Sequence, residues 1–282
     1  MKIRKAVITA ASPTQRTLPL QTLVDTDGQT RTVLRILIGE AHRAGVDQIV
    51  VVVHPGDEAA YRAASDDPGV TFLPQEGPRG YGHAILCAEQ FVGDEYFLHL
   101  VGDHVYTSGS EYGCARQLVD AAQEHGCSVS GLQATRETQL PYFGAIGGRR
   151  TGNRHGLYEI ETVIEKPTPT EAEQVLFVPG LRAGYYLCFF GLHVLSPTVF
   201  SFLHARIATN GSGTAHDFSA VLATLAGRER YLGLEIVGRR FAIDRKYGLL
   251  TAQLGLGLAG CDRGDVLGIL ADVMVQRELA AA

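Results

Sequence analysis

The chain has 282 residues, of which 45% are hydrophobic and 20% are charged. This composition is globular and is sufficient for one large α/β domain or two small ones. The net charge is −5 and the basic residues are scattered singly, so the sequence gives no electrostatic reason to expect duplex nucleic acid or an anionic membrane as a partner. Small anionic substrates such as mononucleotides remain compatible with this charge.

The cysteines and the N-terminus both bear on the compartment. The five cysteines form no CxxC pair and mostly lie in apolar runs such as 185–191, which predicts buried, reduced thiols and a cytoplasmic protein. Basic residues precede an apolar run at 6–11, but that run is shorter than the ~7–15 residues of a signal-peptide core. We interpret it as a buried first strand. No segment approaches the ~18 uninterrupted apolar residues of a membrane span.

Short β-branched runs alternate with longer amphipathic stretches through the first half of the chain. In order, the sequence predicts a strand at 6–11, a helix at 33–45, a strand at 48–53, a helix at 57–64, a helix from Gly82 and a strand at 96–103. This alternation indicates an α/β fold with a mostly parallel, Rossmann-like sheet covered by helices on both faces. Ligands of such sheets bind at the carboxyl ends of the strands, so we expect the site among loops 11–16, 54–56 and 102–104.

The pattern changes after about residue 136. Strand-rich segments at 158–167 and 182–195 precede a helix at 217–227 and further helices near the C-terminus. No linker, repeat or low-complexity tract marks a boundary. We therefore predict a single domain over 1–282, with the strand-rich lobe built on the same sheet.

A glycine-rich turn, 75-QEGPRGYGHA-84, leads into a predicted helix. Backbone N–H groups and small side chains there would let a planar base and its ribose approach closely. A purely structural turn before a helix is the alternative.

Asp103 directly follows an apolar strand in 100-LVGDH-104. A carboxylate at the carboxyl edge of a sheet can bind a hard cation such as Mg²⁺, which in turn bridges phosphates. The alternative is an aspartate that caps the following loop.

Glu165 and Lys166 are adjacent in 164-IEKPTP-169, so within a strand their side chains would point to opposite faces. Pro167 predicts that the strand ends there. One of the two charges could then face the cleft and hold a sugar or its phosphate, whereas the alternative is an ordinary exposed strand edge.

A literal GxGxxG pattern occurs at Gly255, Gly257 and Gly260. Too little chain follows it for the second strand and acidic ribose ligand of a dinucleotide-binding unit. We interpret these residues as helix-packing glycines.

Taken in order, the segments resemble the sugar-1-phosphate nucleotidyltransferases, and most closely the bacterial UTP–glucose-1-phosphate uridylyltransferases. The resemblance rests on KAVITAA, QEGPRGYGHAILCAEQ, FLHLVGD, PYFGAIGG, YEIETVIEKPTP and FFGLHVLSP, and it covers almost the whole chain. It implies a nucleotide-binding half at 1–135, a sugar-binding half at 136–245 and C-terminal helices at 246–282.

The resemblance also implies roles for individual residues. Asp103 would bind the metal, Arg16 would contact the triphosphate, and Lys166 would hold the sugar phosphate. The nucleotide site would contain Ala10, Ala11, Gln75, Gly80, Gly82 and His83. The sugar site would contain Gly144, Glu165, Lys166 and Gly184. The implied cofactor is Mg²⁺, the implied partners are a nucleoside triphosphate and a sugar 1-phosphate, and association into a homo-oligomer is left open.

Two segments depart from the pattern of that family. Its glycine-rich A-G-x-G-T-R loop is replaced by 11-ASPTQR-16, in which Pro13 removes a backbone donor, and Leu20 stands where a phosphate-binding lysine is expected. Ala242 stands where the second metal-binding aspartate is expected. Because residues two apart on a strand share a face, Asp244 is a candidate displaced ligand ~6–7 Å away. The alternative is a helix-capping role for Asp244.

Two hypotheses follow. The first is a uridylyltransferase that makes a UDP-sugar and pyrophosphate from UTP and a hexose 1-phosphate, with Mg²⁺ on Asp103. The second is a catalytically silent module or regulatory subunit that binds a nucleotide sugar. Transfer to a different phosphorylated acceptor is a third alternative, because the sequence does not specify the hexose.

Overall fold

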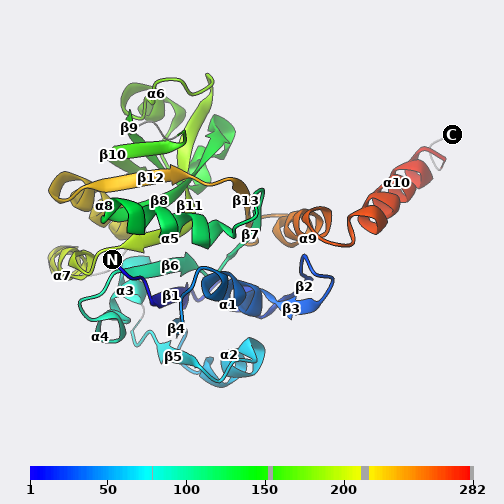
Figure 1. Cartoon of the computed structure of the whole chain (residues 1–282), viewed down its shortest axis with the longest axis horizontal. Coiled ribbons are helices and arrows are strands. Elements are labelled where there is room, and N and C mark those ends of the chain that lie inside the picture. Colours follow the sequence, from blue (N-terminus) through cyan, green and yellow to red (C-terminus); the bar gives the residue numbers. More distant parts are fainter. Residues whose placement is uncertain (78, 152–154, 211–215, 280–282) are drawn as a thin grey trace.

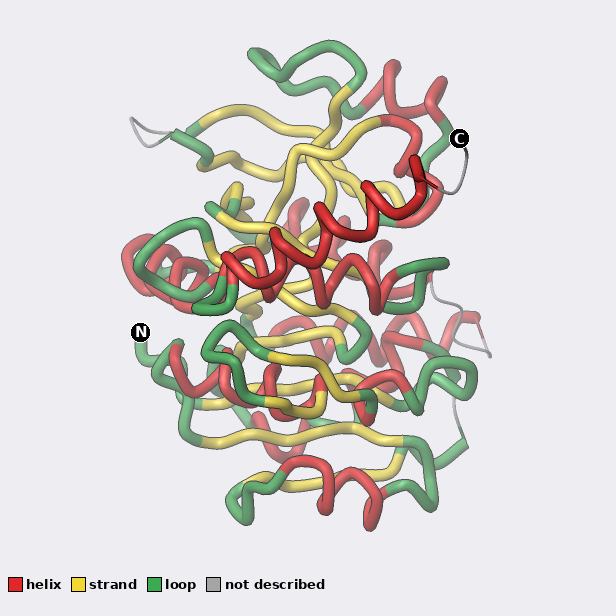
Figure 2. Tube along the Cα trace, turned by 90° about the vertical axis from the view of Figure 1, so that its right-hand side faces the viewer, coloured by secondary structure: helices red, strands yellow, loops and turns green. Residues whose placement is uncertain are grey.

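The structure, a computed structural model, describes residues 1–77, 79–151, 155–210 and 216–279. Its centre is a nine-stranded sheet with the order β5-β4-β1-β6-β11-β8-β12-β10-β9. The strands are β1 (Lys5–Ala10), β4 (Gln48–Val53), β5 (Val70–Pro74), β6 (Phe97–Val101), β8 (Ser128–Arg136), β9 (Gly144–Arg150), β10 (Leu157–Glu165), β11 (Tyr185–Leu195) and β12 (Tyr231–Glu235). Figure 2 shows these strands stacked one above another, with helices packed over them.

The first part of the sheet is parallel. Strands β5, β4, β1 and β6 all pair in parallel. The run Ile49–Val53 is almost entirely removed from solvent, because helices cover both faces of these strands. The α/β class and the helix-covered sheet predicted from the first half of the sequence are therefore confirmed.

The second part of the sheet is mixed. Strand β11 runs antiparallel to both β6 and β8, whereas β8 and β12 are parallel to each other. Strands β9 and β10 form an antiparallel edge. The single strand β11 therefore joins the two halves of the sheet.

Helices cover the sheet in two layers. On one face lie α1 (Val33–Arg43), α2 (Glu58–Ser65) and α5 (Cys114–His125). On the other face lie α3 (Tyr81–Leu86), α4 (Glu89–Val92), α7 (Thr198–Asn210) and α8 (His216–Arg228). A smaller core forms under α6 (Pro169–Val175) and the 3-10 helix η2 (Glu137–Tyr142). The two helix layers cover the faces of the sheet and leave the carboxyl ends of β1 and β6 accessible, where the cavity lies.

Two short ribbons and a 3-10 turn complete the region near the site. Strand β7 (His104–Ser108) pairs with β13 (Gly238–Ala242), and β2 (Thr22–Val24) pairs with β3 (Thr30–Thr32). The 3-10 helix η1 (Leu18–Leu20) follows the first loop. The β7–β13 ribbon brings the C-terminal end of β13 next to Asp103, because Ala242 lies opposite His104 in the register of the ribbon.

The C-terminal helices are α9 (Gly248–Ala259) and α10 (Arg263–Leu279), and α10 projects away from the body of the molecule (Figure 1). A Cβ at Gly255 would collide with the Phe241 ring, and one at Gly257 would lie 2.8 Å from Val266. These glycines allow close helix packing, as predicted. Within the described ranges, no helix has the length and apolar character needed to cross a membrane.

Candidate active site

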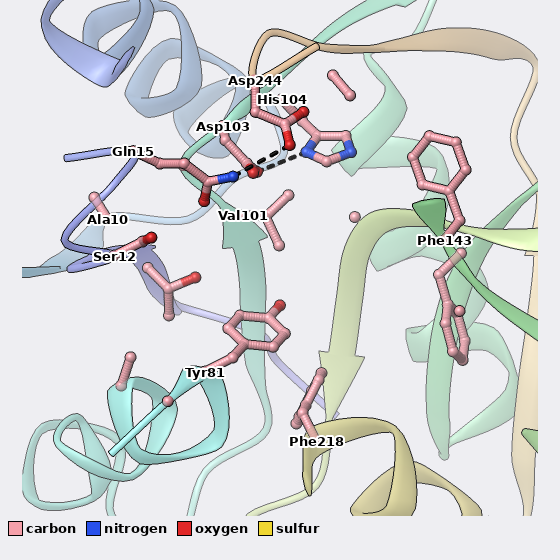
Figure 3. Close-up of a pocket in the computed structure, with 18 of the residues that line it drawn as sticks. Ala10, Ser12, Gln15, Tyr81, Val101, Asp103, His104, Phe143, Phe218 and Asp244 are labelled. Carbon is pink, nitrogen blue, oxygen red and sulfur yellow. Dashed lines mark hydrogen bonds and ion pairs between the residues drawn. The ribbon is translucent and has the colours of Figure 1, made fainter. Parts of the chain in front are cut away.

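A cavity of about 410 Å³ opens at the carboxyl ends of β1 and β6. This is the sheet edge predicted from the strand order. Figure 3 shows Gln15, Asp103, His104 and Asp244 at one side of the cavity and Tyr81 and Phe218 at the other. The predicted residues that line it are Ala10, Ala11, Gln75, Gly80, Asp103, Gly144, Glu165, Lys166 and Asp244. The arrangement thus joins the predicted nucleotide, metal and sugar residues in one space.

The loop that follows β1 closes into short turns. The backbone N–H of Gln15 donates to Ser12 O at 3.1 Å, and that of Leu18 donates to Gln15 O at 2.9 Å. No residue of 11–16 has a positive φ, in keeping with the absence of glycine. Ser12, Pro13 and Gln15 still line the cavity. The loop therefore borders the site with side chains, while part of its backbone donor set is already used within the loop.

Arg16 turns away from the cavity. Its Nε lies 3.3 Å from Asp57 Oδ2 and its Nη1 lies 2.9 Å from His54 Nδ1. The Tyr61 hydroxyl donates to the Arg16 carbonyl at 2.6 Å and fixes the backbone there. Arg16 is absent from the cavity lining, because the Asp57 carboxylate at the start of α2 attracts its guanidinium. The Arg16 guanidinium therefore lies outside the cavity in which the triphosphate contact was predicted.

Arg245 is a cavity cation that the sequence reasoning missed. Its guanidinium lies 3.6 Å from the centre of the Tyr142 ring, and its Nε lies 3.5 Å from Asp244 Oδ1. Among the described residues of the lining, the permanent positive charges are those of Lys166 and Arg245. A signal was available, because Arg245 directly follows the candidate metal ligand Asp244. Stacking on an aromatic ring holds the guanidinium in a fixed plane, which suits contact with phosphate oxygens.

Asp103 lies between β6 and β7, with its carboxylate directed into the site. Its Oδ1 is 2.8 Å from His104 Nδ1. Burial would raise the pKa of the Asp103 carboxyl, but the adjacent His104 and the charge of Arg245 hold that pKa below its ordinary value. The group is thus kept as an anion, the form that binds a cation.

Asp244 completes this side of the cavity. Gln15 Nε2 donates to Asp244 Oδ2 at 3.2 Å, and both Ala242 and Asp244 line the cavity. The N-cap of α9 is Tyr247, so the helix-capping alternative for Asp244 is wrong. Across the described ranges, no cluster of three or more His, Cys, Asp or Glu side chains could hold a metal ion. Two carboxylates beside an open cavity nevertheless fit Mg²⁺, which usually keeps waters and takes its other ligands from phosphates.

The side of the cavity predicted to bind the nucleotide is formed by Gln75 and the turn before α3. Gln75 is buried, and its Nε2 donates to Gly80 O at 2.9 Å and lies 3.0 Å from His83 Nδ1. Gly80 has φ +95°, a conformation that favours glycine. Gly82 and His83 are not part of the lining, and His83 instead supports Gln75 from behind. The missed neighbours Tyr81 and Ala84 face the cavity.

The side of the cavity predicted to bind the sugar, called the sugar side below, is formed at the end of β10. Glu165 Oε2 accepts a hydrogen bond from Ser219 at 2.6 Å, and Lys166 Nζ lies 3.9 Å from Glu165 Oε1. Strand β10 ends at Glu165 and Lys166 has φ +48°, so both side chains line the cavity where the alternation of a strand predicted only one. A left-handed residue before a proline is strained, and such strain is concentrated at functional sites.

The two glycines predicted for the sugar site differ in placement. A Cβ at Gly144 would lie 2.9 Å from Glu165 Oε2 and 2.9 Å from Phe189 Cδ2, so any larger residue would displace these two side chains. Gly184 has φ +75° and lies in the turn before β11, outside the cavity lining. The missed residues of this side are Phe143, Phe189, His193, Phe218 and Ser219.

Comparisons with known proteins agree with this geometry. The profile of the family described as nucleotidyl transferase matches residues 14–241, a range that begins within the loop after β1 and stops before Ala242. The UTP–glucose-1-phosphate uridylyltransferase YngB of Bacillus subtilis is 28% identical, with 98% of this chain and 97% of that protein covered. A second B. subtilis protein of the same activity name is 24% identical over 98% of this chain and 99% of its own length.

Solved structures show the same fold. A UDP-glucose pyrophosphorylase complexed with UDP-glucose superposes with a TM-score of 0.73 at 21% identity, covering 89% of this chain and 97% of the other. The UDP-glucose pyrophosphorylase of Acinetobacter baumannii gives a TM-score of 0.74 at 20% identity, covering 97% of this chain and 100% of the other.

Proposed function

Because the chain belongs to the nucleotidyl transferase family, we propose that it makes a UDP-sugar and pyrophosphate from UTP and a hexose 1-phosphate, with glucose 1-phosphate as the first substrate to test. The observation that carries the proposal is the joint lining of one cavity by Gln75, Asp103, Glu165 and Lys166. These residues come from both halves of the sheet, so their convergence depends on the fold and not on local sequence. The nearly full-length relatives support the same activity.

The proposed reaction needs positioning and charge neutralisation more than a nucleophilic side chain. A phosphate oxygen of the sugar 1-phosphate attacks the α-phosphorus of UTP, and the bond to pyrophosphate breaks as the new P–O bond forms. Lys166 would hold the sugar phosphate, Glu165 would accept hydrogen bonds from sugar hydroxyls, and Arg245 would contact the phosphates that leave. Mg²⁺ held by Asp103 and Asp244 would supply further neutralisation of phosphate charge.

A second candidate is a catalytically silent protein that binds a nucleotide sugar. The observation that favours it is the first loop, which lacks glycine and whose one cation, Arg16, is paired with Asp57 away from the cavity. Such a protein would keep the base and sugar contacts but would hold the β- and γ-phosphates of UTP poorly. It would therefore bind a UDP-sugar more tightly than UTP.

Pyrophosphate release, assayed with a panel of nucleoside triphosphates and sugar 1-phosphates, tests the first proposal. The Asp103→Asn protein, purified in parallel, measures the contribution of contaminating enzymes. Turnover by the wild type well above that background supports a transferase, and silence across the panel with folded protein rejects it. Calorimetry then decides the second candidate, which requires UDP-glucose to bind more tightly than UTP with Mg²⁺.

We also propose a reducing, cytoplasmic location. The support is chemical: the five cysteines are all free thiols in the structure, and three of them, Cys114, Cys127 and Cys188, are buried.

A further inference from the structure

The floor of the cavity contains a buried histidine for which the proposed reaction has no role. His193 lies on β11 directly opposite His99 of β6, and the two imidazole rings stack with their centres 5.6 Å apart. Phe189 and Phe218 surround His193 at ring distances of 5.2 and 5.7 Å. His193 is only 3% exposed, yet it lines the cavity, whereas His99 is 0% exposed and does not. A polar ring placed in an otherwise aromatic floor needs a hydrogen-bond partner.

One nitrogen of His193 is occupied from behind. Its Nδ1 lies 2.6 Å from Ser130 Oγ, and Ser130 Oγ is also hydrogen-bonded to the Tyr231 hydroxyl. If Tyr231 donates to Ser130 and Ser130 donates to Nδ1, every hydroxyl hydrogen of this buried chain has an acceptor. The reverse direction would leave the hydroxyl hydrogen of Tyr231, a residue only 1% exposed, without one. The satisfied arrangement makes Nδ1 an acceptor and places the hydrogen of the neutral ring on Nε2.

The other nitrogen faces the cavity. Among the described residues, none forms a hydrogen bond with His193 Nε2, while Nδ1 of the deeper His99 is fully enclosed. Burial also lowers the pKa of His193 to about 3, so the ring stays neutral and does not attract phosphate by charge. His193 therefore offers a single, oriented, uncharged donor to whatever occupies this part of the cavity.

The position of that donor identifies its partner. Phe189 adjoins both His193 and the sugar side, since its ring centre lies 5.2 Å from that of His193, and its Cδ2 and Glu165 Oε2 would both lie 2.9 Å from a Cβ at Gly144. Ser219, which fixes Glu165, is the chain neighbour of Phe218 in the floor. The Glu165 carboxylate can only accept hydrogen bonds from sugar hydroxyls. The oxygen of a neighbouring sugar hydroxyl can accept a hydrogen bond, and His193 Nε2–H is a donor in the same cavity.

We propose that His193 is a sugar-specificity residue whose Nε2–H donates a hydrogen bond to a hydroxyl oxygen of the hexose bound beside Glu165. This inference rests on the proposed function for the identity of the ligand as a nucleotide sugar. Its test uses binding of UDP-glucose, which does not require turnover, so the failure of one proposal is distinguishable from the failure of the other.

The first experiment compares His193→Phe with the matched control His99→Phe, which removes the stacked imidazole that does not line the cavity. His193→Phe should lower the affinity for UDP-glucose about tenfold, which is the effect of one lost hydrogen bond, and should leave the affinity for UDP unchanged. His99→Phe should leave the ratio of the two affinities at the wild-type value. Equal weakening of UDP and UDP-glucose by His193→Phe would show a structural role and overturn the proposal.

The second experiment uses UDP-glucose derivatives that each lack one sugar hydroxyl. Wild-type protein should lose about tenfold in affinity for one derivative, and His193→Phe should bind that derivative and UDP-glucose equally. His193→Gln, which keeps an amide donor, should recover part of the discrimination. If the His193→Phe protein discriminates among the derivatives as the wild type does, the proposal is wrong.

A third measurement reports the tautomer of His193 directly. ¹⁵N spectra of the histidine side chains should show neutral His193 with its hydrogen on Nε2, and that resonance should shift when UDP-glucose is added but not when UDP is added. A hydrogen on Nδ1 in the free protein would contradict the donor assignment.

Discussion

Gln15 Nε2 donates a hydrogen bond to Asp244 Oδ2 at 3.2 Å, which joins the loop after β1 to the segment after β13. The resemblance described above implies a departure from the family's pattern in both of these segments. Gln15 of the first loop thus orients the carboxylate of Asp244, two residues after Ala242. Because Gln15 and Asp244 are hydrogen-bonded, a variant of either segment should also be examined for its effect on the other segment.

Asp244→Ala should weaken Mg²⁺-dependent nucleotide binding, because it removes one of the two carboxylates that fit the cation. The double variant Ala242→Asp with Asp244→Ala should restore it, since residue 242 also lines the cavity. Calorimetric titration with Mg²⁺ at fixed UTP measures both. Melting curves serve as the control for folding, and an unchanged titration in both proteins would leave Asp103 as the sole protein ligand.

Asp103→Asn should lower turnover by about 100-fold or more, the range lost when a principal electrostatic contributor is removed. The change preserves size and keeps a hydrogen-bonding oxygen toward His104, so the melting temperature should stay near that of the wild type. Near-normal pyrophosphate release from a folded variant would reject the metal assignment.

Arg245→Met should lower the affinity for UTP by about tenfold to 100-fold and leave the affinity for uridine unchanged. The substitution removes a charge-assisted contact to phosphate while it keeps the aliphatic part of the side chain. Arg16→Met is the matched control, since Arg16 is paired with Asp57 outside the cavity. It should leave nucleotide affinity close to the wild-type value. Should the Arg16 variant show the larger loss, the loop must rearrange to bring Arg16 into the site.

Gly144→Ala should raise the KM for the sugar 1-phosphate by about tenfold or more, while the KM for UTP should change little. The added Cβ would crowd Glu165 and Phe189, and overpacked sites force side chains from their positions. Gly227→Ala is the control, because its Cβ would meet nothing within 4 Å. A pair of KM values for each variant checks the expectation, and equal increases for both substrates would place the effect outside the sugar side.

The free energy of unfolding should fall as the pH drops from 7 to 5. Burial lowers the pKa of His193 to about 3 and that of His99 well below its ordinary value, so both stay neutral in the folded state. Unfolded histidine titrates near ~6.5 and then binds a proton that the folded state does not, so acid favours unfolding. For His193 alone the loss is about 2 kcal/mol between pH 7 and 5. Urea unfolding at the two pH values measures it, and His193→Phe should show a smaller difference.

Much of the fold followed from local pattern. The run Gln48–Val53 was predicted as a strand at its observed bounds, because the apolar β-branched segment Ile49–Val53 has few other places in an α/β protein. The antiparallel insertion of β11 between β6 and β8 was not predicted. Pairing partners far apart in the chain leave no periodic signal within either strand.

The site shows the same division. Asp103 and Gly80 follow a strand or open a helix, so their place at the sheet edge could be read from the sequence. The contacts that place Arg16 outside the cavity and Arg245 inside it could not be read in this way, because Arg16 pairs with Asp57 and Arg245 stacks on Tyr142. Both contacts cross long stretches of chain. Charge near a motif is therefore weaker evidence than position on a strand end.

The position of β11 also governs the order in which the protein can assemble as it leaves the ribosome. Strands β5, β4, β1 and β6 can pair once residue 101 has emerged, but the free edge of β6 has no partner until Leu192–Leu195 of β11 have emerged. An unpaired edge of apolar strand is a template for association with other nascent chains. Slow translation between these points would prolong that exposure, and synonymous codon changes there should alter the yield of folded protein without altering its sequence.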